Sequence, residues 1–497
     1  MKPSSYLIAV AAAALFAGSA FAADDTKKKE PEAPKSLWDE TTITGYVEGS
    51  ATPNFNNPYN GLNFGRLFDD RAGSPIFNQG AITVQRPLDP KATGFDWGYK
   101  FQGMVGEDAR YTHFLGEFDY ALHTRTQLDV VEAFAIAHLP VVVDNFLEGG
   151  IDVKVGQFVT LEGAEVINSP DNPLFSKSYI FNFGIPFKHT GIMTITHAKS
   201  WLDLYAGVTS GVNTGLGWTG DNNAGASFHG GIGLNLLDGN LTVLATTHIG
   251  PENPRQLDPL FVGYPNFVIG GIPAACVCDP NDTTRYLNDI TVTWKANDDL
   301  TFITDLNYIH DNGWNPTTQI GLTMTQLTNL GTLTGFPTQL VPLRSKGVSA
   351  FGVAQYGVYK VNDLIKLAAR LEIFRDAENF FVAGYPGYFD FVNFEHGFIN
   401  QAVAAGPANN GTTYFGATLG ATVTPGLPKN DWVKNLILRP EVRWDRAING
   451  TTPFFGALNG PAAFYTTLGG FSPFLGSGRR GSQVTIGLNA IIPFTLK

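Results

Sequence analysis

The sequence predicts an all-β fold: a transmembrane antiparallel up-and-down β-barrel of about 16 strands, with short periplasmic turns and long extracellular loops. Three observations support this prediction. Apolar and polar side chains alternate with a period of two along many segments, those segments are long enough to cross a bilayer, and the connections between them alternate between long and short. Together these observations favour a closed barrel over a soluble β-sandwich.

The N-terminus has the pattern of a secretory signal. Lys2 gives a positive start, an apolar run follows, and Ala20-Phe21-Ala22 is a small-x-small cleavage site. We therefore expect a cleaved signal peptide over 1–22, a flexible periplasmic leader over 23–40 and the barrel over 41–497. Beyond the signal, no apolar run is as long as a membrane-spanning helix requires, which excludes a helical inner-membrane protein.

The composition agrees with an exported β-protein. The 497 residues include 56 Gly, 37 Phe and 17 Tyr but only 4 Met, a balance rich in strand formers and turn residues. The formal net charge of −11 argues against nucleic acid as a partner, because phosphate binding needs a basic surface.

The expected strands share the period-two alternation, and most reach the roughly 9–11 residues of a tilted membrane strand. They cover residues 41–51, 76–87, 95–106, 127–138, 147–158, 188–198, 201–210, 228–236, 241–250, 285–296, 299–310, 347–360, 364–375, 412–424, 435–446 and 482–494.

The connections between these strands alternate in length. The short ones include 199–200, 237–240, 297–298 and 362–363. The long ones cover 52–75, 107–126, 159–187, 211–227, 251–284, 311–346, 376–411 and 447–481. Turns on one rim and loops on the other are the arrangement of outer-membrane barrels, whereas a sandwich has no reason to sort its connections in this way.

Residues 435–446 show the alternation most clearly, with four charged side chains on one side and Leu438, Val442 and Trp444 among those on the other. A one-residue slip would turn those charges toward lipid, where a cation at the midplane costs roughly 2–4 kcal/mol. The ionic sides of the strands are therefore expected to face the lumen. The candidate pore-lining residues are Glu48, Asp152, Lys154, Asp203, Asp305, Lys366, Arg370, Glu372, Arg439, Glu441, Arg443 and Asp445.

Several stretches resemble the OmpL-like family of β-barrel porins. They are Gly45-Tyr46-Val47-Glu48 with Asn56-Asn57-Pro58; Arg66-Leu67-Phe68-Asp69-Asp70-Arg71; residues 155–160 with 163–167; Ser169-Pro170-Asp171-Asn172-Pro173; residues 185–191; residues 438–445; and Thr485-Ile486-Gly487-Leu488. The resemblance implies an outer-membrane barrel that acts as a porin, and it names no solute.

By the same resemblance, the connection 159–187 is a candidate constriction loop, because the equivalent connection of general porins folds into the lumen. Its charged residues are Glu162, Glu165, Asp171 and Lys177. We expect Glu162 and Glu165 to face basic lumen residues such as Arg439 and Arg443. The alternative is an ordinary packed external loop whose acids stay solvated.

No other pattern indicates a catalytic, cofactor or metal site. Cys276 and Cys278 form a C-x-C in a long connection, compatible with a strained disulfide or with free thiols. The nine histidines lack the i, i+4 and H-E-x-x-H spacings of metal sites, so packed or hydrated side chains are expected. The G-x-G-x-x-G at 476–481 precedes a strand and no helix, which fails the context test for a dinucleotide site.

The sequence therefore predicts a non-enzymatic porin without a cofactor, in the cell outer membrane, passing ions or small hydrophilic solutes. Its expected partners are outer-membrane lipid and lipopolysaccharide, those solutes, and further copies of the chain in a homotrimer, by analogy with porins of this size. The overall acidity suggests a mild preference for cations. A barrel that serves as a scaffold for an adhesin or enzyme site in its external loops is the first alternative, and a secreted soluble β-protein is the second.

Overall fold

The computed structural model describes most of the chain between residue 36 and the C-terminus. The described residues are 36–59, 61–89, 94–114, 117–118, 124–215, 225–252, 284–312, 347–378, 381–384, 411–426, 436–457 and 478–497. The expected signal peptide, Cys276 and Cys278 lie outside them, as does most of the expected leader.

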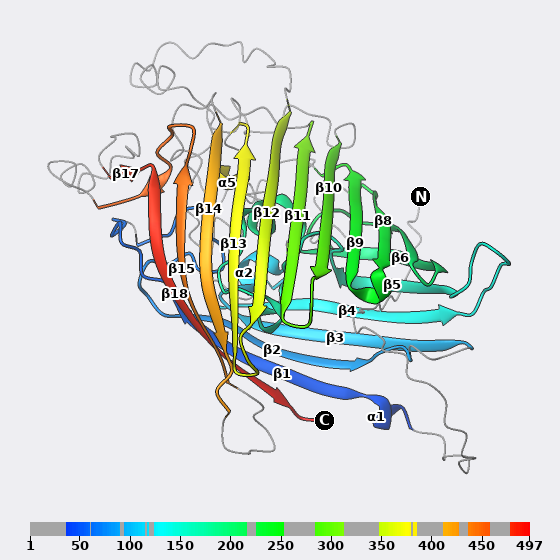
Figure 1. Cartoon of the computed structure of the whole chain (residues 1–497). Helices are drawn as coiled ribbons and strands as arrows, with labels where there is room; N and C mark the ends of the chain where they lie inside the picture. Colours follow the sequence, from blue (N-terminus) through cyan, green and yellow to red (C-terminus); the bar gives the residue numbers. More distant parts are fainter. Residues whose placement is uncertain are drawn as a thin grey trace, which may run out of the picture.

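Sixteen strands form the wall (Figure 1). They are β1 (Thr42–Ala51), β2 (Ile76–Arg86), β3 (Asp96–Gly106), β4 (Gln127–Leu139), β5 (Ile151–Val159), β6 (Lys188–Lys199), β7 (Leu202–Thr209), β8 (Ser227–Leu236), β9 (Leu241–Gly250), β10 (Arg285–Lys295), β11 (Leu300–Asp311), β12 (Val348–Lys360), β13 (Ile365–Asp376), β14 (Thr412–Val423), β15 (Ile437–Ala447) and β18 (Ser482–Thr495).

Each wall strand pairs antiparallel with its neighbours in chain order, and β1 pairs with both β2 and β18. This last pairing closes the ring, so the wall has no strand edge with unpaired backbone groups. The predicted closed antiparallel barrel of 16 strands is therefore confirmed.

The predicted strand ends differ by at most four residues from those observed, and the largest difference is at β5. That strand was expected from residue 147 and begins at Ile151. Gly150 has φ +80°, a left-handed conformation that interrupts an extended strand.

A few short elements lie outside the wall strands. They are α1 (Leu37–Glu40), α2 (Ala109–Thr112), α5 (Phe381–Gly384), η1 (Ser169–Asp171), η2 (Ile180–Gly184), η3 (Leu237–Gly239), and the two-stranded sheet of β16 (Phe454–Phe455) and β17 (Arg479–Arg480). The sequence pattern predicted none of them. Helix α1 lies at the end of the expected leader, where Ser36 and Asp39 form a capping box. No helix among the described residues is long and apolar enough to cross a membrane.

The alternation of the wall strands separates two environments. On β12, Phe351 and Val353 are exposed on the outer side, whereas Ala350, Ala354 and Tyr356 are buried on the inner side. On β15, Val442 and Trp444 are exposed, whereas Glu441, Arg443 and Asp445, which alternate with them, are buried. The strand side that was expected to face lipid is the apolar, exposed one, and the ionic side faces the enclosed space.

Candidate functional site

The connection between β5 and β6 crosses the space enclosed by the wall. We call residues 160–187 the inner segment. Ser169 in η1 donates a hydrogen bond to Glu48 Oε1 on β1 at 2.7 Å, and Ala164 N donates to Asp305 Oδ2 on β11 at 3.0 Å. Strands β1 and β11 are far apart in the strand order, so the segment reaches across the barrel (Figure 1).

Carboxylates of the wall accept hydrogen bonds from the backbone of the inner segment. Glu441 Oε2 on β15 accepts from Phe175 N at 3.0 Å and from Ser176 N at 3.1 Å. Glu372 Oε2 on β13 accepts from Tyr179 N at 2.7 Å. A buried irregular backbone needs partners for its N–H groups, and here the wall carboxylates supply them.

Guanidinium groups of the same strands bind the carbonyl oxygens. Arg439 Nη1 donates to Asn172 O at 2.6 Å, Arg370 Nη1 to Ser176 O at 2.7 Å, and Arg443 Nη1 to Lys177 O at 2.5 Å. We call these contacts to residues 172–179, together with those of Glu372 and Glu441, the arginine attachment. Charge-assisted hydrogen bonds of this kind are about twice as strong as neutral ones.

The arginines also form buried ion pairs. Arg443 pairs with Glu372 at 3.0 Å and with Asp445 at 2.8 Å. Arg370 pairs with Glu372 at 3.1 Å, and with Glu165 of the inner segment at 2.8 Å. Each guanidinium therefore contacts both the segment and a wall acid.

The expected partners of the two loop glutamates differ from those observed. Glu165 pairs with Arg370, and its second oxygen accepts from Ser178 N at 2.7 Å. Glu162 lies on the other side of the barrel, with Oε1 4.0 Å from His229 Nδ1. In the inner segment, Arg439 and Arg443 instead bind the carbonyl oxygens of Asn172 and Lys177.

The two other charged residues of the segment have opposite environments. Asp171 is exposed, whereas Lys177 is buried and donates to Val166 O at 3.0 Å. Burial lowers the pKa of Lys177 to about 8, and the nearby Glu165 carboxylate opposes this shift only in part. Lys177 Nζ also lies 4.9 Å from the ring centre of Phe181.

The remaining candidate wall residues occupy separate places. Asp152 contacts His138 Nδ1 at 2.7 Å and His197 Nε2 at 3.1 Å, and His197 Nδ1 contacts Asp203 at 2.7 Å. This makes a carboxylate–imidazole–carboxylate chain across β5, β6 and β7. Lys154 is buried with its Nζ 5.4 Å from the centre of the Phe158 ring, and Lys366 is exposed.

A second connection, between β1 and β2, also reaches into the barrel, and the sequence pattern did not predict this. Arg66 Nη2 pairs with Asp445 at 2.7 Å, and Arg66 Nη1 with Asp69 at 2.7 Å. Phe68 packs on Phe181 and Phe187 of the inner segment with ring centres 5.5 and 5.8 Å apart. The only sequence signal was the charged Arg66–Arg71 stretch, which was noted for its family resemblance alone.

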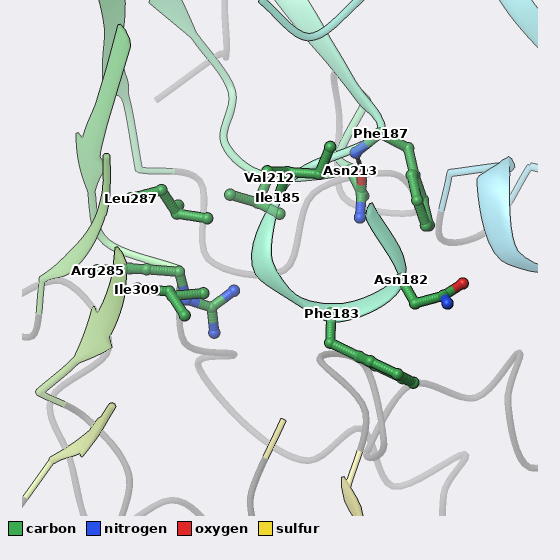
Figure 2. A pocket seen from close by; sticks show the side chains of 9 residues that line it. All are labelled: Asn182, Phe183, Ile185, Phe187, Val212, Asn213, Arg285, Leu287 and Ile309. Carbon is green, nitrogen blue, oxygen red and sulfur yellow. Dashed lines mark hydrogen bonds between the residues drawn. The ribbon is translucent and has the colours of Figure 1, made fainter. Parts of the chain in front are cut away.

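A small pocket lies between the end of the inner segment and the strands β10 and β11 (Figure 2). Phe183, Ile185 and Phe187 line one side, and Leu287 and Ile309 line another. Figure 2 shows the Arg285 side chain among these apolar groups; its Nε donates to Asp311 Oδ2 at 2.8 Å.

Three histidines meet at the start of the inner segment. His189 on β6, His229 on β8 and His248 on β9 are fully buried, and one nitrogen from each ring lies within 4.8 Å of those of the other two. His189 Nε2 lies 3.2 Å from Thr160 Oγ1, and Leu161 N is 3.4 Å from His229 Nε2. We call these contacts to residues 160–162 the histidine attachment. Sequence spacing did not reveal this cluster, because its members come from different strands.

Comparison with known families agrees with the architecture. The sequence model of a family described as "Putative beta-barrel porin-2, OmpL-like" matches residues 40–494. The chain belongs to this family, and its class is that of outer-membrane β-barrel channel proteins. The resemblance noted from the sequence is thereby confirmed. No curated protein matches the chain.

Solved porins share a distant likeness with the barrel. The outer-membrane channel DcaP of Acinetobacter baumannii is 12% identical, with 91% of this chain and 97% of that chain covered and a TM-score of 0.45. OprB of Pseudomonas putida is 12% identical, with 92% of this chain and 95% of that chain covered and a TM-score of 0.46. The anion-selective porin from Comamonas acidovorans is 8% identical, with 92% of this chain and 99% of that chain covered and a TM-score of 0.44. The family assignment rests on the family model.

Proposed function

We propose that this protein forms a water-filled channel in the outer membrane through which ions or small hydrophilic solutes diffuse passively, and that the inner segment is its constriction. The observation that supports this most is the arginine attachment. It holds an irregular stretch of backbone across the barrel interior with buried, charge-assisted hydrogen bonds. A segment held in this way would narrow the lumen at a fixed place.

Polar side chains on the inner face of the wall, farther along the strands, support a water-filled lumen. On β10 the inward side begins with the buried Arg285, Leu287 and Asp289 and continues with Thr291 and Thr293, which are half-buried. On β2 the half-buried Thr83 and Gln85 continue the inward side in the same way. Small polar side chains that keep part of their surface free suit a passage for hydrated solutes.

Conductance of the purified protein in a planar bilayer tests the channel. We expect discrete steps in KCl, and reversal potentials in a salt gradient that indicate a mild preference for cations, as the net charge of −11 suggests. A bilayer that stays sealed across the full range of potentials would show that the protein is no open pore.

Deletion of 160–184 tests the constriction separately. We expect conductance to rise several-fold in the deletion variant, with faster entry of sugars and amino acids in liposome swelling. Arg446→Met, on the outward side of β15, is the matched control and should leave conductance unchanged. A deletion variant that folds, as judged by heat-modifiable migration in gels, and conducts like the parent would remove the constriction role but leave the channel.

The processing and assembly of the chain follow from the same proposal. Residues 1–22 would be removed as a signal peptide, 23–40 would form a periplasmic leader, and 41–497 would make the barrel. The pore-lining roles proposed from the sequence apply to the inward charges of β1, β5, β7, β11, β13 and β15. We propose a homotrimer in the outer membrane; native mass spectrometry in detergent and N-terminal sequencing of the mature protein test these points.

A further inference from the structure

The three histidine rings lie close enough together to be drawn onto one metal ion. The ring centres of His189 and His229 are 4.3 Å apart, those of His189 and His248 5.1 Å, and those of His229 and His248 5.8 Å. In a tetrahedral zinc site, with Zn–N bonds of about 2.0–2.1 Å, ligand nitrogens lie roughly 3.3 Å apart. In the cluster the nitrogens lie within 4.8 Å of one another, and the rings of His189 and His248 are stacked at an interplanar angle of 18°, so a bound ion would require these rings to turn and draw closer.

Strand register explains why these rings meet. His229 on β8 and His248 on β9 are directly opposite each other. On the other side of β8, the residue opposite His229 is Gly207 of β7, and Gly211 follows that strand. His189 lies on β6, one strand beyond β7, and its ring centre is 4.3 Å from that of His229.

Partners outside the cluster orient two of the rings. His248 Nε2 lies 2.7 Å from Glu252 Oε1, and His189 Nδ1 lies 3.0 Å from Gly211 O. A histidine that donates one N–H to a carboxylate or carbonyl presents the lone pair of its other nitrogen, the usual arrangement of metal-binding histidines. For His248 this leaves Nδ1, which has no hydrogen-bond partner among the described residues, as the nitrogen that can bind a metal ion.

Unpartnered polar atoms converge on the same place. Within the part of the chain that the structure describes, His229 Nδ1, His248 Nδ1 and both carboxylate oxygens of Glu162 have no hydrogen-bond partner. Glu162 is 2% exposed and the histidines are fully buried. A buried carboxylate without a partner is costly, and a bound cation would remove this cost.

We propose that His189, His229 and His248 bind one divalent transition-metal ion, with the Glu162 carboxylate as a fourth ligand. Three imidazoles and one carboxylate are a donor set that Zn²⁺ accepts, and Cu²⁺ and Ni²⁺ also bind imidazole. Because Glu162 lies in the inner segment and the histidines in the wall, the ion fixes the start of the segment to β6, β8 and β9.

Metal content and spectroscopy test the site on the full-length mature protein, purified without a polyhistidine tag. After stripping with chelator, we expect it to take up one equivalent of Zn²⁺ and to show a higher unfolding temperature with Zn²⁺ present. Co²⁺ in place of Zn²⁺ should give the visible absorption bands of a tetrahedral site. A wild-type protein that binds neither ion stoichiometrically overturns the proposal.

Variants locate the site. His248→Ala and His229→Ala should each lose stoichiometric Zn²⁺ binding, and Glu252→Gln, which removes the charge that orients His248, should weaken it about 10–100-fold. His310→Ala is the matched control, because His310 lies on β11 away from the cluster and bonds Ser349 and Asn312. Zn²⁺ binding that survives in both cluster variants, or is lost in the control, contradicts the assignment. If a cluster variant does not fold, the Co²⁺ spectrum of the unchanged protein decides.

Discussion

The two places where the inner segment meets the wall differ in how their polar groups are satisfied. In the arginine attachment, Glu441 and Arg443 each contact backbone atoms of the segment directly. In the histidine attachment, the carboxylate oxygens of Glu162 have no hydrogen-bond partner among the described residues, and the contact from Leu161 N to His229 Nε2 is long, at 3.4 Å.

This difference indicates that the two attachments stabilise the inner segment in different ways. Charges that are paired and hydrogen-bonded hold the backbone in place without any further ligand. Buried carboxylate oxygens and imidazole nitrogens without hydrogen-bond partners stabilise the segment only weakly until a ligand binds between them. Measurements of the unfolding free energy of variants in each attachment test this difference.

The largest effect is expected for Arg443→Met. Its side chain is fully buried and pairs with Glu372 and Asp445, so the substitution leaves two buried carboxylates with less compensation. Removing one partner of a buried ion pair typically costs about 3–5 kcal/mol. Urea unfolding of the refolded barrel measures this loss.

The control for that variant is Arg446→Met on the same strand. Arg446 is exposed on the outward side of the strand, and we expect its substitution to change the free energy of unfolding by no more than about 0.5 kcal/mol. Equal losses of unfolding free energy in both variants would mean that the inward contacts of Arg443, and with them the arginine attachment, do not stabilise the protein.

The second prediction concerns the pH dependence set by Lys177. Its pKa is about 8 in the folded protein and about 10.5 when unfolded, so the unfolded state binds more protons between these values. Stability should therefore rise with pH from about 8 to about 10.5, by at most on the order of 3 kcal/mol. Lys177→Met should flatten this rise in urea unfolding measured across the window, and an unchanged slope in the variant would contradict the assignment to Lys177.

A smaller effect is expected for Glu441→Gln. The variant keeps the shape of the side chain but loses the charge that strengthens the bonds from Phe175 N and Ser176 N. We expect a loss of about 1–2 kcal/mol in urea unfolding, together with noisier single-channel currents because the segment is held less firmly. Glu148→Gln, at an exposed carboxylate that pairs with Lys199, is the control and should change neither property.

The wall could be predicted because its signal is local. The alternation along 435–446 shows which side of a single strand meets lipid. The start of β5 was the largest error, because the interruption at Gly150 leaves the alternation of the strand unchanged. The inward direction of Arg439 and Arg443 follows from the same pattern. No knowledge of distant contacts was needed for these inferences.

The partners of those charges could not be predicted, because they depend on how a long connection returns to the wall. Glu165 and Arg370 are 205 positions apart in the chain, and Arg66 and Asp445 are 379 apart. The histidine cluster depends on the registers of four adjacent strands. Spacing rules for metal ligands describe one helix or one turn, so they do not detect residues that a sheet brings together.

The smallest effect is expected at the histidine attachment itself, for Thr160→Val in metal-free protein. The Thr160 hydroxyl accepts from Glu162 N at 3.2 Å and contacts His189 Nε2 at 3.2 Å, so the substitution removes two long, neutral contacts. Net hydrogen-bond contributions of this kind suggest a loss of about 0.5–1.5 kcal/mol in urea unfolding. A loss as large as that of Arg443→Met would show that the histidine attachment holds the inner segment without an added ligand, and the distinction between the two attachments would then disappear.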